Sequence, residues 1–454
     1  MQLTIEKLIY GGDGLARLPA DERGRGKAVF VPFVLPGEVV EAALVEERPG
    51  FARARVEKIV RASEERVGPG CRYFQRCGGC HYQHARYEHQ LAMKAEILKE
   101  NLRRIAKVEL KSELQVHASP AWNYRNRTRL RAQTKPAFAV GYYKFGSHEL
   151  LAVEECPISS PLINRAISAV WKLGRDGMGP GLGEVEFFVD AGDSQLLVEV
   201  FREPEDERQR TRSKEKKSTT TTDTKGHEGN TLKRWASALK NELPELAGVG
   251  LRPDSRGLLG TDGQGDRPHI LYGADHLTYR TRRASYRVSA GSFFQVNRYL
   301  TDELVRIVVD EHSGETAIDL YAGVGLFSTV LARGFRHIEA VESSQSSFAD
   351  LQYNSPANVK AVCASAAQYL QVRTGKLQAD FVVVDPPRSG LGEAVVRHLV
   401  RLGAPRMTYV SCDPATLARD LKNLLAAEYR IEQAHLVDLF PQTYHLESVL
   451  QLVR

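Results

Sequence analysis

The chain has 454 residues, of which 42% are hydrophobic and 26% charged, values typical of a globular protein with several buried cores. Its six cysteines are too few for a disulfide scaffold, and no apolar run is long enough to span a membrane. A net charge of +6 permits a polyanionic partner, and the polar N-terminal segment does not resemble a signal peptide, so we expect a cytoplasmic protein with reduced thiols.

Residues 1–62 are predicted to form a small β-barrel. The runs Lys27–Val45, interrupted by Pro36-Gly37, and Phe51–Val60 have the β-branched spacing of strands. This pattern is typical of oligonucleotide-binding barrels. The next segment, His89–Val108, places apolar residues at helical spacing and predicts an amphipathic helix.

The remaining chain is predicted to form two more domains. Residues 63–288 have a mixed, mostly β pattern, and 203–230 within them carry so few apolar residues that we expect a flexible insertion. Residues 289–454 alternate strand and helix, which predicts an α/β domain with a doubly wound, mostly parallel sheet of the Rossmann-like class.

Ligands of such sheets bind at the carboxyl ends of the strands. Gly323 and Gly325 form a turn after one predicted strand, and Glu342 closes the next, where its carboxylate can accept hydrogen bonds from a ribose. The third glycine of the dinucleotide fingerprint is missing, so S-adenosylmethionine fits better than NAD, and the alternative is that the glycines form tight turns without a cofactor.

Two further strand ends carry reactive groups. Asp385 precedes two prolines, which predicts either a stiff loop holding a carboxylate beside the substrate or a plain turn. Cys412 follows a strand, with Asp413 as the predicted N-cap of a helix whose dipole would favour a nucleophilic thiolate. Cys363 is expected to be inert packing.

Together these segments resemble the RNA 5-methyluridine methyltransferases. The matching stretches run in the family's order through the last domain: SFFQVN (292–297), DLYAGVGLF (319–327), AVES (340–343), DPPRSGL (385–391), YVSCDP (409–414) and FPQTYHLES (440–448). The resemblance implies that Cys412 is the nucleophile, that Glu447 is the proton-abstracting base, and that the S-adenosylmethionine contacts are Gln295, Tyr321, Glu342 and Asp385. The chain departs from the family in having Asp413 where Asn is frequent and Ala322 where Cys is frequent.

The expected chemistry explains the residue types. A thiolate that adds to carbon 6 of uracil makes carbon 5 nucleophilic enough to attack a sulfonium methyl group, and a base must then remove the carbon 5 proton. No metal is required at the reacting centre. The target uridine must be single-stranded or flipped out of its stack.

Four other cysteines form a predicted metal centre. Cys71, Cys77 and Cys80 lie in one loop, and Cys156 follows much later in a Cys-Pro pair. Four thiolates can hold zinc or an iron–sulfur cluster, and three in one loop favour a [4Fe-4S] cluster. A radical mechanism would need an iron left open, which four protein ligands do not provide. In the resembling family, one branch combines this cysteine spacing with an RNA-binding TRAM barrel.

An arginine ladder suggests RNA contact. Arg125, Arg127, Arg129 and Arg131 would point to one face of a strand, where they would bind phosphates, while Trp122 and Tyr124 would stack on bases. The alternative is a solvated strand face. We expect the Arg127→Ala, Arg129→Ala pair to weaken RNA binding and flatten its salt dependence.

The favoured function is methylation of a uridine in 23S ribosomal RNA. Transfer RNA is the alternative substrate, an amino-group methyltransferase is a second enzymatic reading, and an RNA-binding iron–sulfur protein is a non-enzymatic one. No membrane partner is expected, and a monomer is presumed because the sequence is silent on assembly.

Overall fold

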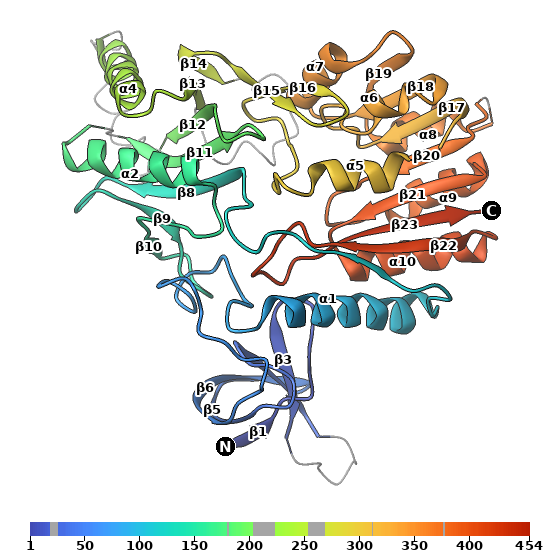
Figure 1. The fold of residues 1–454 in the computed structure, drawn as a ribbon, viewed down its shortest axis with the longest axis horizontal. Helices are drawn as coiled ribbons and strands as arrows, with labels where there is room; N and C mark the ends of the chain where they lie inside the picture. Colours follow the sequence, from blue (N-terminus) through green and yellow to red (C-terminus); the bar gives the residue numbers. More distant parts are fainter. Residues whose placement is uncertain (19–25, 179–180, 203–222, 253–267, 311, 376) are drawn as a thin grey trace, which may run out of the picture.

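The computed structural model describes residues 1–18, 26–178, 181–202, 223–252, 268–310, 312–375 and 377–454, with only the main chain described for 223–230. Three large sheets and a hairpin organise the described residues (Figure 1). In Figure 1 the N-terminal barrel lies at the bottom, a second β unit at the upper left and the C-terminal α/β unit at the right. Within the described residues, no helix combines the length and the apolar character needed to cross a bilayer.

The N-terminal barrel consists of short strands, as predicted. Its sheet has the order β1-β5-β6-β4-β3-β2, and buried aliphatic side chains such as Val29, Val31 and Val40 fill its interior. The strand bounds are β1 Gln2–Thr4, β2 Lys7–Leu8, β3 Asp13–Arg17, β4 Ala28–Pro32, β5 Val39–Glu47 and β6 Phe51–Arg61.

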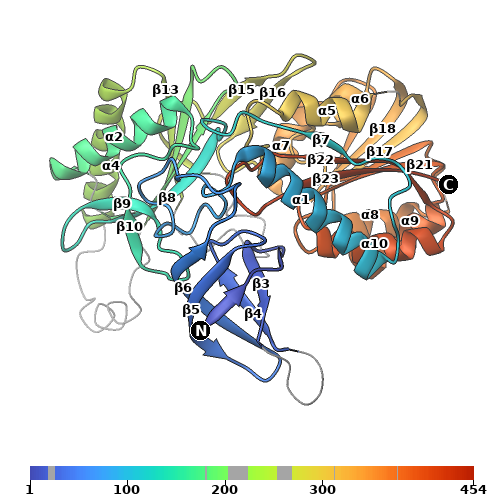
Figure 2. The same ribbon diagram turned by 60° about the horizontal axis from the view of Figure 1, so that its bottom comes forward.

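The predicted amphipathic helix is confirmed as α1 (Tyr87–Asn101), which ends in the π-helical turn η1 (Leu102–Ala106). It lies between the barrel and the C-terminal sheet (Figures 1 and 2). The buried face of α1 includes one charged residue that its apolar pattern did not predict. Lys94 is fully buried, and its Nζ lies 2.6 Å from the carboxylate of Asp438.

The central unit is a seven-stranded sheet of order β10-β9-β8-β11-β12-β13-β14, with helices α2 and α4 packed against it. Of the segment expected to be a flexible insertion, 203–222 lie outside the described residues, but the expectation is wrong for 223–230, which begin α4. The bounds are β8 Arg127–Gln133, β9 Ala139–Tyr143, β10 Leu150–Ala152, α2 Pro161–Arg175, β11 Leu182–Val189, β12 Leu196–Arg202, α4 Asp223–Glu242, β13 Leu246–Arg252 and β14 His269–Gly273.

The C-terminal unit is an eight-stranded sheet of order β19-β18-β17-β20-β21-β23-β22-β7. The strands β17 (Gly314–Leu320), β18 (Phe335–Glu342), β19 (Val359–Cys363), β20 (Phe381–Val384) and β21 (Arg406–Ser411) are parallel, as predicted. The last two strands, β22 (Arg430–Val437) and β23 (Glu447–Val453), pair antiparallel, and β7 (Gln115–His117) joins the sheet edge from a distant part of the chain.

Helices cover both faces of this sheet. Adjacent residues of β20 show the alternation, because Val382 packs with one buried core while Val383 packs with the other. The first core receives α8 (Ala366–Arg373), α9 (Gly392–Leu402) and α10 (Pro414–Ala426), together with α1. The second receives α5 (Thr301–Val309), α6 (Ser328–Leu331) and the hairpin β15–β16 (His276–Arg280, Ser285–Ser289), and α7 (Gln345–Asn354) packs beside β16.

Candidate active site

The register of β21 and β23 brings the predicted nucleophile and the predicted base together. Ser411, the last residue of β21, pairs with Ser448 in β23, and the Ser448 hydroxyl donates to the Ser411 carbonyl over 3.1 Å. In an antiparallel ladder the next pair outward is Cys412 and Glu447. Both residues therefore lie at the same end of the paired strands, where the cysteine is half-buried and the glutamate is buried.

The surroundings of Cys412 disfavour the thiolate form of its side chain. Burial, followed by the carboxyl groups of Glu447 and Asp385, raises its pKa to about 12, against an opposing effect of Arg388. The expected effect of the following helix dipole acts in the opposite direction to these causes and stays a prediction. Burial also raises the pKa of Glu447 well above its ordinary value.

Asp413 caps the helix that follows the cysteine, as predicted. Its carboxylate accepts hydrogen bonds from the main-chain N–H groups of Ala415 and Thr416 over 3.0 and 2.9 Å, and Pro414 occupies the first turn. The same carboxylate contributes to the raised pKa of Cys412. The chain thus has an ionised cap where the resembling family frequently has a neutral one.

Asp385 begins a loop that is braced on α10. Asp420 accepts hydrogen bonds from the Leu391 N–H and the Tyr409 hydroxyl over 2.7 and 2.9 Å, and Thr416 donates to the Arg388 carbonyl over 3.1 Å. Burial, and next the charge of Asp319, raises the pKa of Asp385.

The end of β17 leads into a glycine turn, and the end of β18 provides a carboxylate. Glu342 accepts hydrogen bonds from the Gly323 and Ser344 N–H groups over 2.9 and 2.6 Å. Tyr321 has φ 65°, a left-handed conformation that non-glycine residues rarely adopt outside functional sites. A Cβ placed on Gly323 would meet nothing within 4 Å, so open space adjoins the turn.

Gln295 is the predicted site residue that does not lie at the end of a catalytic strand. It is buried in the segment between β16 and α5, whose main chain is held by Asn126 of the central unit through a 3.0 Å bond to the Gln295 carbonyl. Ser292 begins the same segment and donates to Asp350 over 2.7 Å. The motif therefore connects the central and C-terminal units.

The pattern of strand ends did not identify two neighbours of Cys412, Tyr10 and Arg388. The Tyr10 hydroxyl donates to the main-chain carbonyl of Cys412 over 2.9 Å from the N-terminal barrel. Arg388 lies against the His445 ring, with its Nη2 3.3 Å from Nδ1, and burial lowers the pKa of His445 to about 3. Arg388 could have been singled out because it follows the Asp-Pro-Pro turn, whereas no local signal marks Tyr10.

The other four predicted ligands meet in one place. Cys71, Cys77, Cys80 and Cys156 all line a cavity of about 270 Å³. Burial raises the pKa values of the first three thiols, that of Cys77 to about 11. No three His, Cys, Asp or Glu side chains of the described residues are grouped closely enough to hold a single metal ion. The four thiols are soft sulfur donors on one cavity wall, and Arg125 adds a cation to that wall.

Cys363 and the arginine ladder differ from expectation. Cys363 is exposed at the end of β19 rather than packed inside. Arg127, Arg129 and Arg131 do share one strand face, but they are engaged within the sheet by Glu184 and Glu186 of β11 at 2.8–3.4 Å.

These ion pairs hold the arginine side chains within the sheet, whereas the sequence predicted side chains that bind phosphates. Arg127 and Arg129 also stack on Phe188 and Phe201, 4.3 and 4.1 Å from the ring centroids. These contacts argue against a free phosphate-binding row, and the alternative of a merely solvated face is also wrong. Tyr124 cannot stack on a base because it is fully buried.

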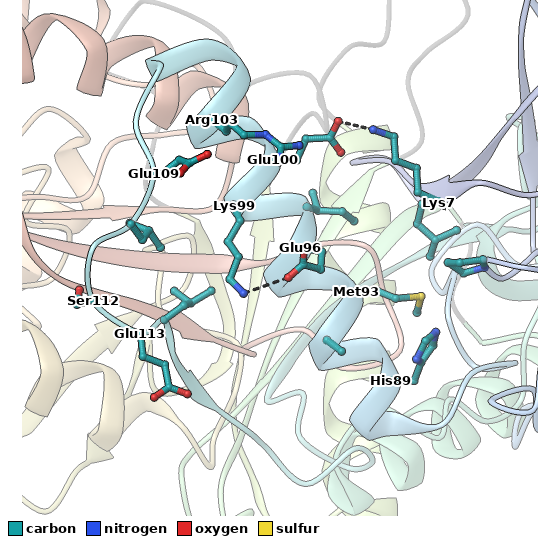
Figure 3. A pocket seen from close by; sticks show the side chains of 16 residues that line it. Lys7, His89, Met93, Glu96, Lys99, Glu100, Arg103, Glu109, Ser112 and Glu113 are labelled. Atoms are coloured by element: carbon teal, nitrogen blue, oxygen red, sulfur yellow. Dashed lines mark hydrogen bonds and ion pairs between the residues drawn. The ribbon is translucent and has the colours of Figure 1, made fainter.

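A separate cavity of about 730 Å³ lies between α1, the barrel and residues 109–114 (Figure 3). Its charged side chains have mixed signs and include the ion pairs Lys7–Glu100 and Lys99–Glu96. None of the predicted site residues lines it.

Known proteins match the chain over its whole length. Residues 270–454 match the tRNA (uracil-5-)-methyltransferase family, and residues 1–56 match the TRAM domain. Proteins named uncharacterized RNA methyltransferase are 34% identical in Aquifex aeolicus and 31% identical in Caldanaerobacter subterraneus subsp. tengcongensis, each match covering all of this chain and 98% of the relative. The crystal structure of Pyrococcus abyssi tRNA (uracil-54, C5)-methyltransferase with S-adenosyl-L-homocysteine superposes with a TM-score of 0.70 at 25% identity, covering all of both chains.

Proposed function

Because the chain belongs to the RNA uracil-5-methyltransferase family and is an S-adenosylmethionine-dependent enzyme of that kind, we propose that it methylates a uridine of 23S ribosomal RNA through a covalent bond to Cys412. The observation that carries the mechanism is the register of β21 and β23, which places Cys412 and Glu447 directly beyond the paired residues Ser411 and Ser448. A nucleophile and a base on the same sheet edge match the two roles that carbon 5 methylation requires.

In the proposed mechanism, Cys412, which is only half-buried, gives up its proton to water as its sulfur bonds to carbon 6 of the flipped uracil, and the sulfur regains a proton from water after its release. Because the pKa of the thiol is raised by burial and by neighbouring carboxyl groups, the proton must leave during this addition. Carbon 5 then takes the methyl group that S-adenosylmethionine supplies. Glu447 removes the carbon 5 proton, the double bond re-forms, and the sulfur of Cys412 is released.

The proposed cofactor contacts are Gln295, Tyr321, Glu342 and Asp385. Glu342 presents a carboxylate at the end of β18, beside the open space at Gly323, which suits the hydroxyl groups of a ribose. The left-handed Tyr321 turns the chain between the end of β17 and the glycine turn.

We test the covalent step with RNA that contains 5-fluorouridine. Fluorine in place of the carbon 5 proton prevents its removal, so the wild-type protein should form a denaturation-resistant complex with the RNA. Cys412→Ala should form none and should transfer no methyl group, whereas Cys363→Ala, which changes an exposed cysteine, should behave as wild type. A complex that forms equally well without the Cys412 thiol would refute the mechanism.

Transfer RNA is the second candidate substrate. It is favoured by the whole-length similarity to the Pyrococcus abyssi enzyme, whose name specifies uracil 54 of tRNA. Measurement of 5-methyluridine by mass spectrometry in purified 23S RNA and in tRNA, from cells with and without the gene, separates the two. Loss confined to tRNA would replace the ribosomal assignment.

We also propose that Cys71, Cys77, Cys80 and Cys156 hold a [4Fe-4S] cluster with a structural role. The support is that four thiols from two distant segments line one cavity. A bound cluster would cross-link those segments. Anaerobically purified protein should contain iron and acid-labile sulfide, Cys156→Ala should lose both, and the control Cys363→Ala should keep them. Zinc in place of iron in the wild type would refute the cluster.

A further inference from the structure

The N-terminal barrel reaches the candidate catalytic centre through one turn. Tyr10, Gly11 and Gly12 connect β2 to β3, and both glycines have positive φ values, 110° and 96°. A Cβ on Gly12 would lie 3.0 Å from the ring of His81. The turn is therefore fitted closely against the segment that follows the cysteine loop, and a side chain at this position would displace it.

The barrel is seated on the C-terminal unit rather than joined to it by a loose linker. Leu8 and Leu35 of the barrel are buried in the same hydrophobic core as Leu417 and Leu421 of α10. Tyr10 packs against this core, and its ring meets that of Tyr444 edge-on at a centroid distance of 5.4 Å. The phenol therefore has a fixed position.

The hydroxyl of this phenol binds the main chain of the nucleophile. It donates to the Cys412 carbonyl over 2.9 Å, although the two residues are 402 positions apart. Cys412 lies between the end of β21 and the start of α10. The N–H of Thr416, one helical turn further, is not available to the Cys412 carbonyl, because it donates to the side chain of Asp413. The Tyr10 bond therefore holds a carbonyl that neither the strand ladder nor this N–H secures.

We propose that Tyr10 is a positioning residue for Cys412, so that the barrel forms part of the catalytic centre as well as an RNA-binding module. The proposal rests on the proposed covalent role of Cys412. Tyr10 acts through the peptide group of the cysteine: with the carbonyl held, the Cα–Cβ bond of Cys412 keeps the direction that aims sulfur at carbon 6. Without the hydroxyl, this peptide group is free to rotate, and the fraction of reactive geometries falls.

The experiment compares Tyr10→Phe with Tyr429→Phe. The Tyr429 hydroxyl donates to the Ala404 carbonyl over 2.8 Å. The control therefore also loses a hydrogen bond from a tyrosine hydroxyl to a main-chain carbonyl of the C-terminal unit. The readout is the single-turnover rate of adduct formation with 5-fluorouridine RNA at saturating RNA and S-adenosylmethionine. We also measure the Kd of each ligand and the melting temperature.

Tyr10→Phe should slow adduct formation by about fivefold to tenfold, the effect of one lost hydrogen bond, while both Kd values stay within about twofold of wild type. Tyr429→Phe should react at the wild-type rate. Gly12→Ala, which moves the turn but keeps the phenol, should slow the reaction in the same way and serves if Tyr10→Phe does not fold. A wild-type rate for Tyr10→Phe, or an equal loss in Tyr429→Phe, would overturn the proposal. Absence of any adduct with the wild-type protein would instead overturn the covalent mechanism.

Discussion

Glu447 starts β23 at the position directly beyond the Ser411–Ser448 pair, beside the strand end that carries Cys412. The two side chains influence each other, because the Glu447 carboxyl group helps to raise the pKa of the Cys412 thiol. If Glu447 is the base and Cys412 the nucleophile, as proposed, a base that disfavours ionisation of the nucleophile fits a reaction in which the two groups act one after the other. The site is therefore expected to be chemically quiet until RNA enters.

Glu447→Gln separates the two steps. The variant keeps the size and hydrogen-bonding capacity of the side chain but cannot remove the carbon 5 proton. We expect a denaturation-resistant complex with ordinary uridine RNA to accumulate, while release of methylated RNA falls by about 100-fold or more, the usual contribution of a general base. The complex is measured by electrophoresis and the product by mass spectrometry.

Glu432→Gln is the matched control, because Glu432 is an exposed glutamate of the neighbouring strand β22. It should show wild-type turnover and no accumulated complex. Wild-type turnover in Glu447→Gln would show that another group removes the proton.

Asp413→Asn tests how the helix cap affects the thiol. Asn is as good an N-cap as Asp, so α10 should keep its start, but the negative charge beside Cys412 disappears. Since Asp413 is one of the groups that raise the pKa of Cys412, the substitution should lower it. Alkylation of Cys412 by iodoacetamide, followed from pH 7 to 10 by peptide mass spectrometry, should accelerate at lower pH than in wild type.

Asp413→Ala supplies the control for the cap. It removes the same charge and also the hydrogen bonds to Ala415 and Thr416, so it should cost about 1 kcal/mol of stability that Asp413→Asn retains. An unchanged alkylation profile in Asp413→Asn would mean that burial and the other neighbours, Glu447, Asp385 and Arg388, set the pKa of the thiol without Asp413.

Local sequence patterns were enough to predict the helices and strands. The pKa of Cys412 and the ion pairs of the arginine ladder depend on contacts between residues that are far apart in the sequence. The strand ends at Glu342, Asp385 and Cys412 were predictable because parallel strands place their carboxyl ends on one edge. The raised pKa of Cys412 was not predictable, because Glu447 lies beside it only through the antiparallel register of β23. Likewise, the period of the arginine ladder was readable, whereas its pairing with Glu184 and Glu186 depends on which strand lies beside β8.

Asp319 should make stability depend on pH near neutrality. It is fully buried, and burial raises its pKa from 3.8 to about 7. Because the folded-state pKa lies above the unfolded one, protonation stabilises the fold below pH 4, and this contribution is lost as the pH rises to 7. Asp319→Asn can still accept the hydrogen bond from the Ser328 N–H. Its free energy of unfolding relative to that of wild type should therefore rise by about 4 kcal/mol from pH 4 to pH 8.

Urea denaturation at several pH values measures this difference. Asp176→Asn, at an exposed helix end, should run parallel to wild type throughout. If the Asp319→Asn and wild-type curves stay parallel from pH 4 to 8, the carboxyl group does not titrate in this range.

Lys94 should be the most costly charge in α1 to remove. Its ammonium group and the Asp438 carboxylate are both fully buried 2.6 Å apart, and the same Nζ donates to the Phe440 carbonyl over 2.9 Å. Lys94→Met would leave Asp438 as an unpaired buried charge, so the free energy of unfolding should fall by about 3–5 kcal/mol.

Lys99→Met on the exposed face of α1 is the control, because it removes only a surface ion pair with Glu96. It should lower the free energy of unfolding by less than about 1 kcal/mol. The double variant Lys94→Met, Asp438→Asn should recover part of the loss, because the unpaired charge is gone. A Lys94→Met protein as stable as Lys99→Met would show that this ion pair does not fix α1 to the segment leading to Glu447.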